Sequence, residues 1–368
     1  MTVNTITLDG FRNYSDFSAE FSDKVNVIIG DNAQGKTNLI EAIHFMTSGR
    51  SFRAKSDKEL IGFDRDSAYI RANIRSGDRE QKLEACLSRI KRRQFLANGV
   101  RLQAASELSG KLRAVLFCPD DLDLIREGAA VRRRLMDVCL CQLRPRYASI
   151  LAEFNKLLDH KTRILRDYHD KPSLLYTLDD FDYRLAVMSA ELIRYRAAFA
   201  LLLSERAARV HKEFSGGAEN LSIKYCTVKT ITDTSRPAAE LLAQILEHQN
   251  AHRRAELETG SCLTGAHKDE LDIEINSKSA RSFASQGQAR TAALSVKLAE
   301  RQIHRDDRGE YPLLLLDDVL SELDTGRQDF ILNHIKEGQV FITCCDDARI
   351  ASRTGGKVHR INAGRLLE

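Results

Sequence analysis

The chain has 368 residues, of which 43% are hydrophobic and 29% charged, a balance typical of globular proteins large enough for two or more domains. No apolar run approaches the roughly 18 residues of a membrane helix, and the N-terminus lacks the basic-then-apolar pattern of a signal peptide. The eight cysteines form no CxxC pair, which disfavours a disulfide framework or a zinc site. We therefore expect a cytoplasmic protein that does not act in a membrane.

Positive charge is concentrated in two segments. Residues 50–113 hold 16 Lys and Arg against 8 Asp and Glu, and residues 126–166 hold 10 against 4, whereas the net charge of the whole chain is only +4. Two basic segments on an otherwise acidic chain indicate an anionic polymer as partner. Ordinary solvated surface charge explains this composition equally well.

The N-terminal part contains a phosphate-binding motif in its required context. Residues 1–24 predict two short strands, and residues 25–29 a buried β-branched strand. The segment GDNAQGKT, residues 30–37, then matches GxxxxGK[ST], and apolar residues at helical spacing follow up to Gly49. Strand, glycine-rich turn and helix is the arrangement that this motif needs.

Each residue type in the motif has a chemical reason. Gly30 and Gly35 let the backbone curl around a phosphate, and the helix that begins near Lys36 adds its positive end. Lys36 can reach the β- and γ-phosphates, and the Thr37 hydroxyl can bind Mg²⁺. The predicted nucleotide-binding residues of this loop are Gly30, Asp31, Asn32, Ala33, Gln34, Gly35, Lys36 and Thr37.

The middle of the chain changes from strands to helices. Alternating residues from 67 to 97 and the Asn98-Gly99 turn predict an antiparallel β module, and residues 119–217 read as almost purely helical. Each part carries a basic cluster that we assign to DNA contact on charge clustering alone. The two clusters are Lys91, Arg92 and Arg93 beside Phe95, and Arg132, Arg133 and Arg134.

Two later segments contain residues suited to binding a phosphate or its metal ion. Residues 282–290, SFASQGQAR, lead into a long helix whose free N–H groups suit a phosphate, although Ser285 as an ordinary helix N-cap is the alternative. Residues 312–318, PLLLLDD, predict a buried strand that ends in two carboxylates. This is the metal-side half of a P-loop ATPase, in which Asp317 holds Mg²⁺ and Asp318 orients or deprotonates the attacking water. Asp318 and Lys36 are therefore the expected catalytic residues.

The order of these motifs is similar to that of ABC-type ATPase heads, which include the structural-maintenance-of-chromosomes proteins and Rad50. Further segments narrow the resemblance to the RecF family of bacterial recombination mediators, over essentially the whole chain. They are FRNY (11–14), GRSFR (49–53), CPDDLDLIREGAAVRRR (118–134), TGAHKDEL (264–271) and ASQGQAR (284–290).

The resemblance implies an α/β fold: an ABC-type P-loop ATPase head with a mixed sheet, an antiparallel β subdomain and an inserted helical arm. The head would comprise residues 1–118 and 261–368, and the arm residues 119–260. Residues 30–37 look like Walker A, and 321–324 like the D-loop. Asp317 and Asp318 look like Walker B. Residues 285–288 look like the signature motif, which in this family faces the γ-phosphate of the other protomer's ATP. They are Ser285, Gln286, Gly287 and Gln288.

For function, the resemblance implies a homodimer that forms with ATP and Mg²⁺ on DNA, both single- and double-stranded, with a preference for gap junctions. Such a protein works with RecO and RecR to load RecA in recombinational repair, replication restart and the SOS response. ATP hydrolysis is expected to be slow and to act as a switch.

The sequence departs from the ABC pattern in three places. Asp318 stands where many heads have Glu, and the strand predicted at 339–343 ends in Cys344, Cys345 and Asp346 with no switch His. Ala266 and Lys268 replace the expected Pro and Arg, and no Q-loop glutamine can be assigned.

Two other functions stay open on the sequence. One is an ABC-type ATPase subunit of a nuclease, another DNA-processing enzyme or a transporter; a nuclease would need a second metal cluster, which the motifs do not show. The other is a helical scaffold whose ATP site is vestigial, against which the intact Lys36, Thr37, Asp317 and Asp318 argue.

Overall fold

The computed structural model describes residues 1–345 and 348–367, and it divides into two compact units. The first unit combines Met1–Asp123 with Val296–Glu368, and the second is Leu124–Ser295. The second boundary falls inside helix α7 (Gln286–Arg308), not near residue 260, so residues 285–288 belong to the second unit.

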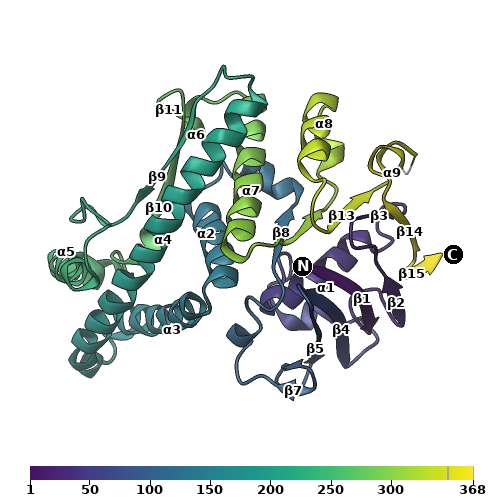
Figure 1. Cartoon of the computed structure of the whole chain (residues 1–368). Coiled ribbons are helices and arrows are strands. Elements are labelled where there is room, and N and C mark those ends of the chain that lie inside the picture. Colours follow the sequence, from purple (N-terminus) through teal and green to yellow (C-terminus); the bar gives the residue numbers. More distant parts are fainter. Residues whose placement is uncertain (346–347, 368) are drawn as a thin grey trace. The chain divides into compact units, whose positions relative to one another are not determined.

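The first unit contains a six-stranded, mainly parallel sheet in the order β15-β14-β3-β13-β12-β8 (Figure 1). All its pairings are parallel except that of β14 with β15. Its strands are β3 (Val25–Ile29), β8 (Ala114–Phe117), β12 (Leu313–Leu316), β13 (Val340–Cys344), β14 (Lys357–Asn362) and β15 (Arg365–Leu367). The apolar runs predicted as buried strands at 25–29 and 313–316 are confirmed, and the carboxyl ends of β3, β12 and β13 meet at one sheet edge.

A second, antiparallel sheet of the same unit has the order β2-β1-β4-β5-β6-β7. Its strands are β1 (Thr2–Asp9), β2 (Phe17–Glu20), β4 (Ser67–Ser76), β5 (Arg79–Ser88), β6 (Gln94–Ala97) and β7 (Val100–Arg101). Helix α1 (Lys36–Ser48) follows β3, and its apolar side chains form one core cluster with those of both sheets. The predicted mixed sheet with an antiparallel β subdomain is thus confirmed.

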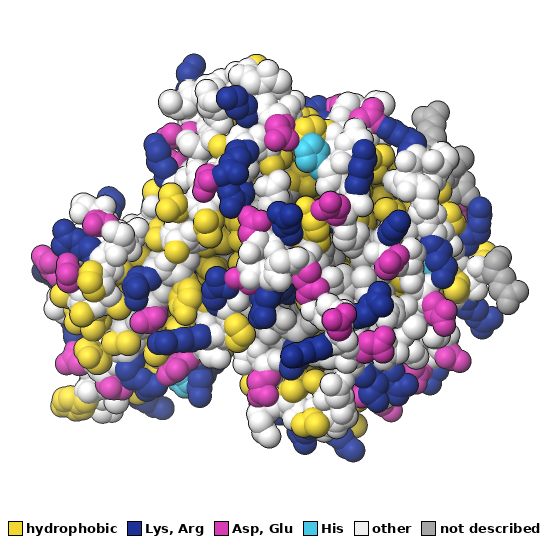
Figure 2. Space-filling model, viewed as in Figure 1, with side chains coloured by type: hydrophobic (Ala, Val, Ile, Leu, Met, Phe, Trp, Pro, Cys, Tyr) yellow, Lys and Arg dark blue, Asp and Glu magenta, His cyan; other side chains and the backbone are white. Residues whose placement is uncertain are grey.

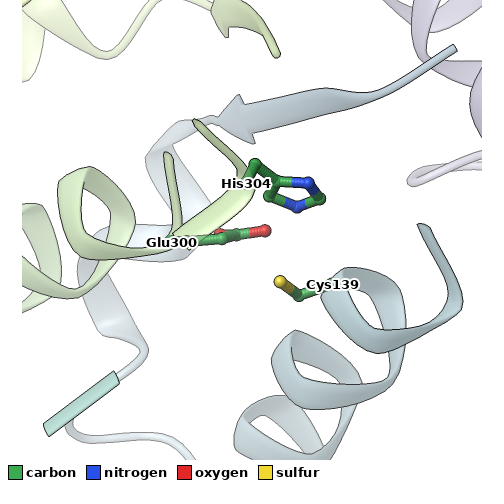
Figure 3. Close-up of side chains that lie close together, drawn as sticks. All are labelled: Cys139, Glu300 and His304. Carbon is green, nitrogen blue, oxygen red and sulfur yellow. The ribbon is translucent and has the colours of Figure 1, made fainter. Parts of the chain in front are cut away.

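The remaining helices of the first unit are α8 (Thr325–His334), α9 (Ala348–Thr354) and the C-terminal part of α7. That part of α7 carries buried charges: Lys297 Nζ lies 2.6 Å from Glu300 Oε2, with both side chains less than 10% exposed. Glu300 and His304 extend from successive turns of α7 (Figure 3), and burial lowers the pKa of His304 to about 3. Cys139 in the same view belongs to α2 of the second unit.

The second unit is mostly helical but contains a small antiparallel sheet in the order β11-β10-β9. Its strands are β9 (Leu221–Cys226), β10 (Glu270–Ile275) and β11 (Lys278–Ser279). Its helices are α2 (Ala129–Leu143), α3 (Pro145–Asp167), α4 (Leu178–Phe214), α5 (Ala238–Thr259), α6 (Ala280–Phe283) and the first part of α7. Pro145 occupies the first turn of α3, where its missing N–H costs no hydrogen bond, so it separates α2 from α3.

Buried ion pairs hold the helices of this unit together. Arg196 on α4 is 2% exposed and donates to Asp137 on α2 at 2.8 Å and to Asp269 at 2.7 Å. Asp269, in the TGAHKDEL segment, also accepts from Thr227 Oγ1 at 2.7 Å. Burial raises the pKa of Asp269 and the Arg196 guanidinium opposes that rise. This acidic residue is therefore a structural anchor of the second unit.

The described residues include no helix that is both long and apolar enough to cross a lipid bilayer. All eight cysteines are free thiols.

Candidate nucleotide-binding site

The phosphate loop between β3 and α1 requires both of its glycines. Gly35 has φ 120°, and a Cβ there would lie 2.8 Å from Asn13 Nδ2. A Cβ on Gly30 would lie 2.3 Å from the carbonyl oxygen of Ile361. Among the described residues, no side chain caps the N-terminus of α1, so its first N–H groups are available for an anion. The predicted strand, turn and helix are confirmed.

Two distant segments hold this loop from outside. Tyr14 Oη donates to Gly35 O at 2.9 Å, and Asn13 Nδ2 donates to Gln34 O at 2.9 Å. The Gly364 amide donates to the same Gln34 oxygen at 3.0 Å. Burial raises the pKa of Tyr14, so it remains a neutral donor. The FRNY segment and the C-terminal hairpin therefore shape the loop, roles that the sequence did not reveal.

Lys36 lies folded over the loop that it follows. Its Nζ donates to Gly30 O at 2.8 Å and to Asp31 O at 3.0 Å, and lies 3.5 Å from Cys345 Sγ. The side chain is only 4% exposed. Its ammonium group is thus held inside the loop by backbone carbonyls, where it can interact with a bound phosphate.

The structure brings Thr37 and Asp317 together, although 280 residues separate them in the chain. Thr37 Oγ1 donates to Asp317 Oδ1 at 3.0 Å, and Thr343 Oγ1 donates to the same oxygen at 2.9 Å. Burial raises the pKa of Asp317, and these two hydroxyls oppose the rise. A hydroxyl and a carboxylate are hard oxygen ligands, so this pair fits Mg²⁺.

Asp318 follows in a strained backbone conformation. Its φ is 51°, and its amide donates to Thr343 Oγ1 at 2.8 Å. Its carbonyl accepts from Ser321 Oγ at 2.6 Å. A left-handed non-glycine residue costs roughly 1–3 kcal/mol, and such strain concentrates at functional sites. The two backbone bonds hold Asp318 beside Asp317 at the sheet edge.

A cavity of about 350 Å³ adjoins the loop at the ends of β3, β13 and β14. Its lining residues are Ile29, Gly30, Asp31, Gln34, Cys345, Arg360, Ile361, Asn362 and Leu367. Cys345 Sγ, in the region where ABC heads have the switch His, contacts Asn32 Oδ1 at 3.1 Å. Asp346, the predicted end of this segment, lies outside the described residues.

The signature segment belongs to the second unit. Ser285 and Gln286 are exposed at the start of α7, and Gly287 and Gln288 are half-buried. The Ser285 amide donates to Gln288 Oε1 at 2.9 Å, and the Gln288 amide donates to Ser285 Oγ at 3.2 Å. Ser285 therefore is a helix N-cap, and it is also exposed for a ligand.

The basic cluster on α2 needs correction. Arg132 is 3% exposed, and its guanidinium binds both carboxylate oxygens of Glu270 at 2.7 Å, so it cannot contact DNA. Arg133 NH1 donates to Asp269 O at 2.6 Å, which commits part of its charge to the fold. Arg134 is exposed. Glu270, 138 residues later in the chain, neutralises one of these charges, which a local count of charge cannot reveal.

In the other cluster, Lys91 and Arg92 are exposed, whereas Arg93 has intramolecular partners. Arg93 NH1 pairs with Asp57 Oδ1 at 3.1 Å and donates to Gly49 O at 2.9 Å. On the face seen in Figure 2, Lys and Arg side chains lie among Asp and Glu and form no single uninterrupted patch.

Fold and site together define an ABC-type ATPase head. The family model described as RecF/RecN/SMC N terminal domain matches residues 2–355. The DNA replication and repair protein RecF of Acetivibrio thermocellus is 38% identical over 367 residues, with 99% of each chain covered. RecF of Clostridium kluyveri is 36% identical over 371 residues, covering 98% of this chain and 100% of that protein.

The solved structure of the recombination mediator RecF with ATP, in the RecFOR pathway, superposes with a TM-score of 0.91 at 32% identity, covering 99% of this chain and 96% of that one. The Smc head domain of Pyrococcus furiosus, with a TM-score of 0.55 and 16% identity over 99% of this chain and 94% of that one, shares the fold. This chain therefore belongs to the RecF family of DNA replication and repair proteins.

Proposed function

We propose that this chain binds ATP with Mg²⁺ and closes into a homodimer on DNA during recombinational repair. The observation that carries the proposal is the 3.0 Å contact between Thr37 and Asp317, which unites the phosphate loop and the carboxylate strand in one site. The proposal is also supported by a related protein, RecF, whose structure has been solved with ATP. The family's repair role favours this function over the alternative of a nuclease subunit.

In the proposed mechanism, the N–H groups of residues 32–37 and Lys36 Nζ bind the β- and γ-phosphates. Thr37 and Asp317 would hold Mg²⁺, which when bound neutralises charge on the phosphates. Asp318 orients water for attack and accepts its proton. As a side chain one methylene shorter than Glu, it suits the slow turnover of a switch.

Dimerisation uses the exposed start of α7. We place Ser285 and Gln286 of one protomer against the γ-phosphate bound by the other, because they lie at an uncovered helix N-terminus. The γ-phosphate then supplies the contact that favours the closed dimer, and hydrolysis removes it.

DNA contact is assigned to exposed cations of the first unit. Lys91 and Arg92 are exposed, and the open face of the antiparallel sheet presents Arg71 and Lys82. Glu84 pairs with Arg71 at 3.4 Å and with Lys82 at 3.3 Å, so it weakens the positive field of that face. We therefore assign the larger share of phosphate contact to Lys91 and Arg92, with little sequence preference.

RecO and RecR are the proposed partners and the cytoplasm the proposed location. RecF-ATP is described as part of the RecFOR pathway, and this chain covers 96% of that protein. With these partners, the chain would help to load RecA next to single-stranded gaps in DNA.

Sedimentation velocity tests the composite site. The wild type, Ser285→Arg and the control Asn250→Arg, which adds the same charge on α5, are compared with ADP and with the slowly hydrolysed analogue ATPγS. We expect wild type and control to dimerise with ATPγS only, and Ser285→Arg to bind nucleotide and stay monomeric. Dimers of Ser285→Arg at wild-type nucleotide concentrations would overturn the composite site.

A further inference from the structure

The segment that begins α7 depends on one side-chain amide. Gln288 accepts the Ser285 amide through Oε1, while its own backbone N–H binds Ser285 Oγ. If the Gln288 amide rotated by half a turn, its Nε2 donors would face the Ser285 N–H, which also donates. The orientation of this amide therefore decides whether the Ser285 N–H has Gln288 as its acceptor.

A carboxylate fixes that orientation. Gln288 Nε2 donates to Glu219 Oε1 at 2.7 Å. Because an ionised carboxylate only accepts hydrogen bonds, Glu219 selects the amide rotamer that leaves Oε1 for Ser285. A charge-assisted bond of this kind is stronger than a neutral one.

Glu219 is in turn held by a buried imidazole. His211 Nε2 lies 2.9 Å from Glu219 Oε2, and the His211 ring is fully buried on α4. Burial lowers the pKa of His211 and Glu219 opposes that change. In the neutral ring the one proton belongs on Nε2, since Glu219 cannot donate, and Nδ1 lies 3.3 Å from Ser295 Oγ, whose own proton goes to Thr291 O.

The turn after α4 places Glu219 in reach of both partners. Gly216 and Gly217 have φ of 59° and 85°, values that glycine adopts without a steric penalty. The Glu219 amide donates to Ser215 Oγ at 3.2 Å, and the Glu219 side chain is only 20% exposed. The end of α4 is thus connected through Glu219 to the start of α7.

We propose that Glu219, oriented by His211, is a positioning residue that keeps Ser285 and its neighbours in the conformation that receives the partner protomer's ATP. This inference rests on the proposed dimer. Glu219 acts only through Gln288, and the ligand class is the γ-phosphate of a nucleoside triphosphate held by a second copy of this chain. A purely structural cap would affect the stability of the chain and leave its dimerisation threshold unchanged.

The test compares wild type with Glu219→Ala and Glu219→Gln, and with Glu247→Ala as a matched control, an exposed Glu on α5. Sedimentation velocity gives the ATPγS concentration at half-dimerisation, a fluorescent ATP analogue gives the affinity of the dilute monomer, and thermal melting reports stability. For Glu219→Ala we expect the half-dimerisation concentration to rise by about tenfold or more, with monomer affinity within about twofold of wild type.

Glu219→Gln is expected to restore dimerisation to within about threefold of wild type, because its Oε1 accepts from Gln288 and its Nε2 donates to His211 once the ring proton moves to Nδ1. Wild-type dimerisation by Glu219→Ala, or equal defects in Glu219→Ala and Glu219→Gln, overturns the inference alone. A wild-type chain that stays monomeric overturns the proposed function and this inference with it.

If Glu219→Ala does not fold, Glu219→Asp carries the test. It keeps the charge and withdraws the carboxylate by one methylene, so the half-dimerisation concentration must also rise. A wild-type value for a folded Glu219→Asp protein overturns the inference.

Discussion

Thr37 Oγ1 and Asp317 Oδ1 lie 3.0 Å apart, so the hydroxyl that follows the phosphate loop touches the carboxylate that ends β12. Thr343 Oγ1, from the end of β13, contacts the same oxygen at 2.9 Å. The first turn of α1 and the ends of two strands thereby meet at one point. Parallel strands place their carboxyl ends along one edge, and that geometry explains why residues from such distant parts of the chain meet there.

Asp317→Asn is expected to weaken Mg²⁺-dependent ATPγS binding by about 100-fold, because the neutral amide loses the charge that a hard cation requires. The amide oxygen still accepts from Thr37 and Thr343, so the fold persists. Titration calorimetry with and without Mg²⁺ measures the effect, and Thr37→Ser, which keeps the hydroxyl, is the control. Equal Mg²⁺-dependent affinity in Asp317→Asn and wild type would remove Asp317 from the metal site.

Asp318→Asn is expected to slow ATP turnover by about 10²–10⁴-fold, the usual contribution of a general base. Asn tolerates the left-handed backbone that residue 318 adopts, so the backbone bonds to Thr343 and Ser321 remain. ATP-driven dimers should therefore accumulate and persist, as read by single-turnover hydrolysis and sedimentation with ATP. Wild-type turnover in this variant would show that another group activates the water.

We expect Arg132→Ala to lower stability and Arg92→Ala to weaken DNA binding, so that the two variants distinguish the two roles. Removing Arg132 leaves Glu270 without its bidentate partner, which lowers the free energy of unfolding by about 3–5 kcal/mol. Arg92→Ala, at an exposed site, changes that free energy by less than about 0.5 kcal/mol.

For DNA binding, we expect the exposed Arg92 to matter more than the buried Arg132. Arg92→Ala should weaken binding of a gapped duplex and reduce the slope of log K against log salt by about 1, the share of one phosphate contact. Urea unfolding and fluorescence anisotropy at several salt concentrations measure the two effects. An unchanged salt slope in Arg92→Ala would withdraw the assignment of this cluster to DNA.

Because His359 is buried, we expect the first unit to lose stability in acid. His359 is 3% exposed on β14, its Nε2 lies 3.1 Å from Asn26 Oδ1, and burial lowers its pKa to about 4. The pKa of a histidine in the unfolded chain is about 6.5. Between that pH and about pH 4, the unfolded chain therefore binds a proton that the folded chain excludes. The stability contributed by His359 is therefore present above pH 6.5 and falls with pH by up to about 3 kcal/mol.

Urea unfolding between pH 4.5 and 7 checks this effect. His359→Gln, which keeps a donor for Asn26, should show a shallower loss of stability than wild type, and the exposed-site control His169→Gln should not. Identical pH profiles for His359→Gln and wild type would contradict the pKa assignment.

Local patterns predicted much of the site. The apolar run at 25–29, the loop and the amphipathic residues after it form one continuous segment, so their structure follows from neighbouring residues. The four leucines before Asp317 likewise form a buried strand that places two carboxylates at its end. The assignment of Thr37 and Asp317 to one Mg²⁺ came from their motifs, whereas the order of the strands was not predicted, because strand pairing is a non-local property.

The failures share a physical cause: charge is counted locally but neutralised at a distance. Arg132 lies in a basic cluster of the sequence, but in the fold its charge is paired with Glu270. The Glu219–His211 pair carries no motif, since its function depends on a turn that brings the end of α4 to the start of α7. A single buried His and a half-buried Glu give no such signal in a sequence.

The hydrogen bond from the Gly364 amide to Gln34 O has a consequence for protein synthesis. The Ala363 amide also donates to Gln34 Oε1, at 2.6 Å. A nascent chain has its loop residues 30–37 early but acquires Asp317 only after a further 280 residues, and the Gly364 anchor later still. A nascent chain that has not yet reached Asp317 and Gly364 therefore lacks both of these contacts to the phosphate loop and its following threonine.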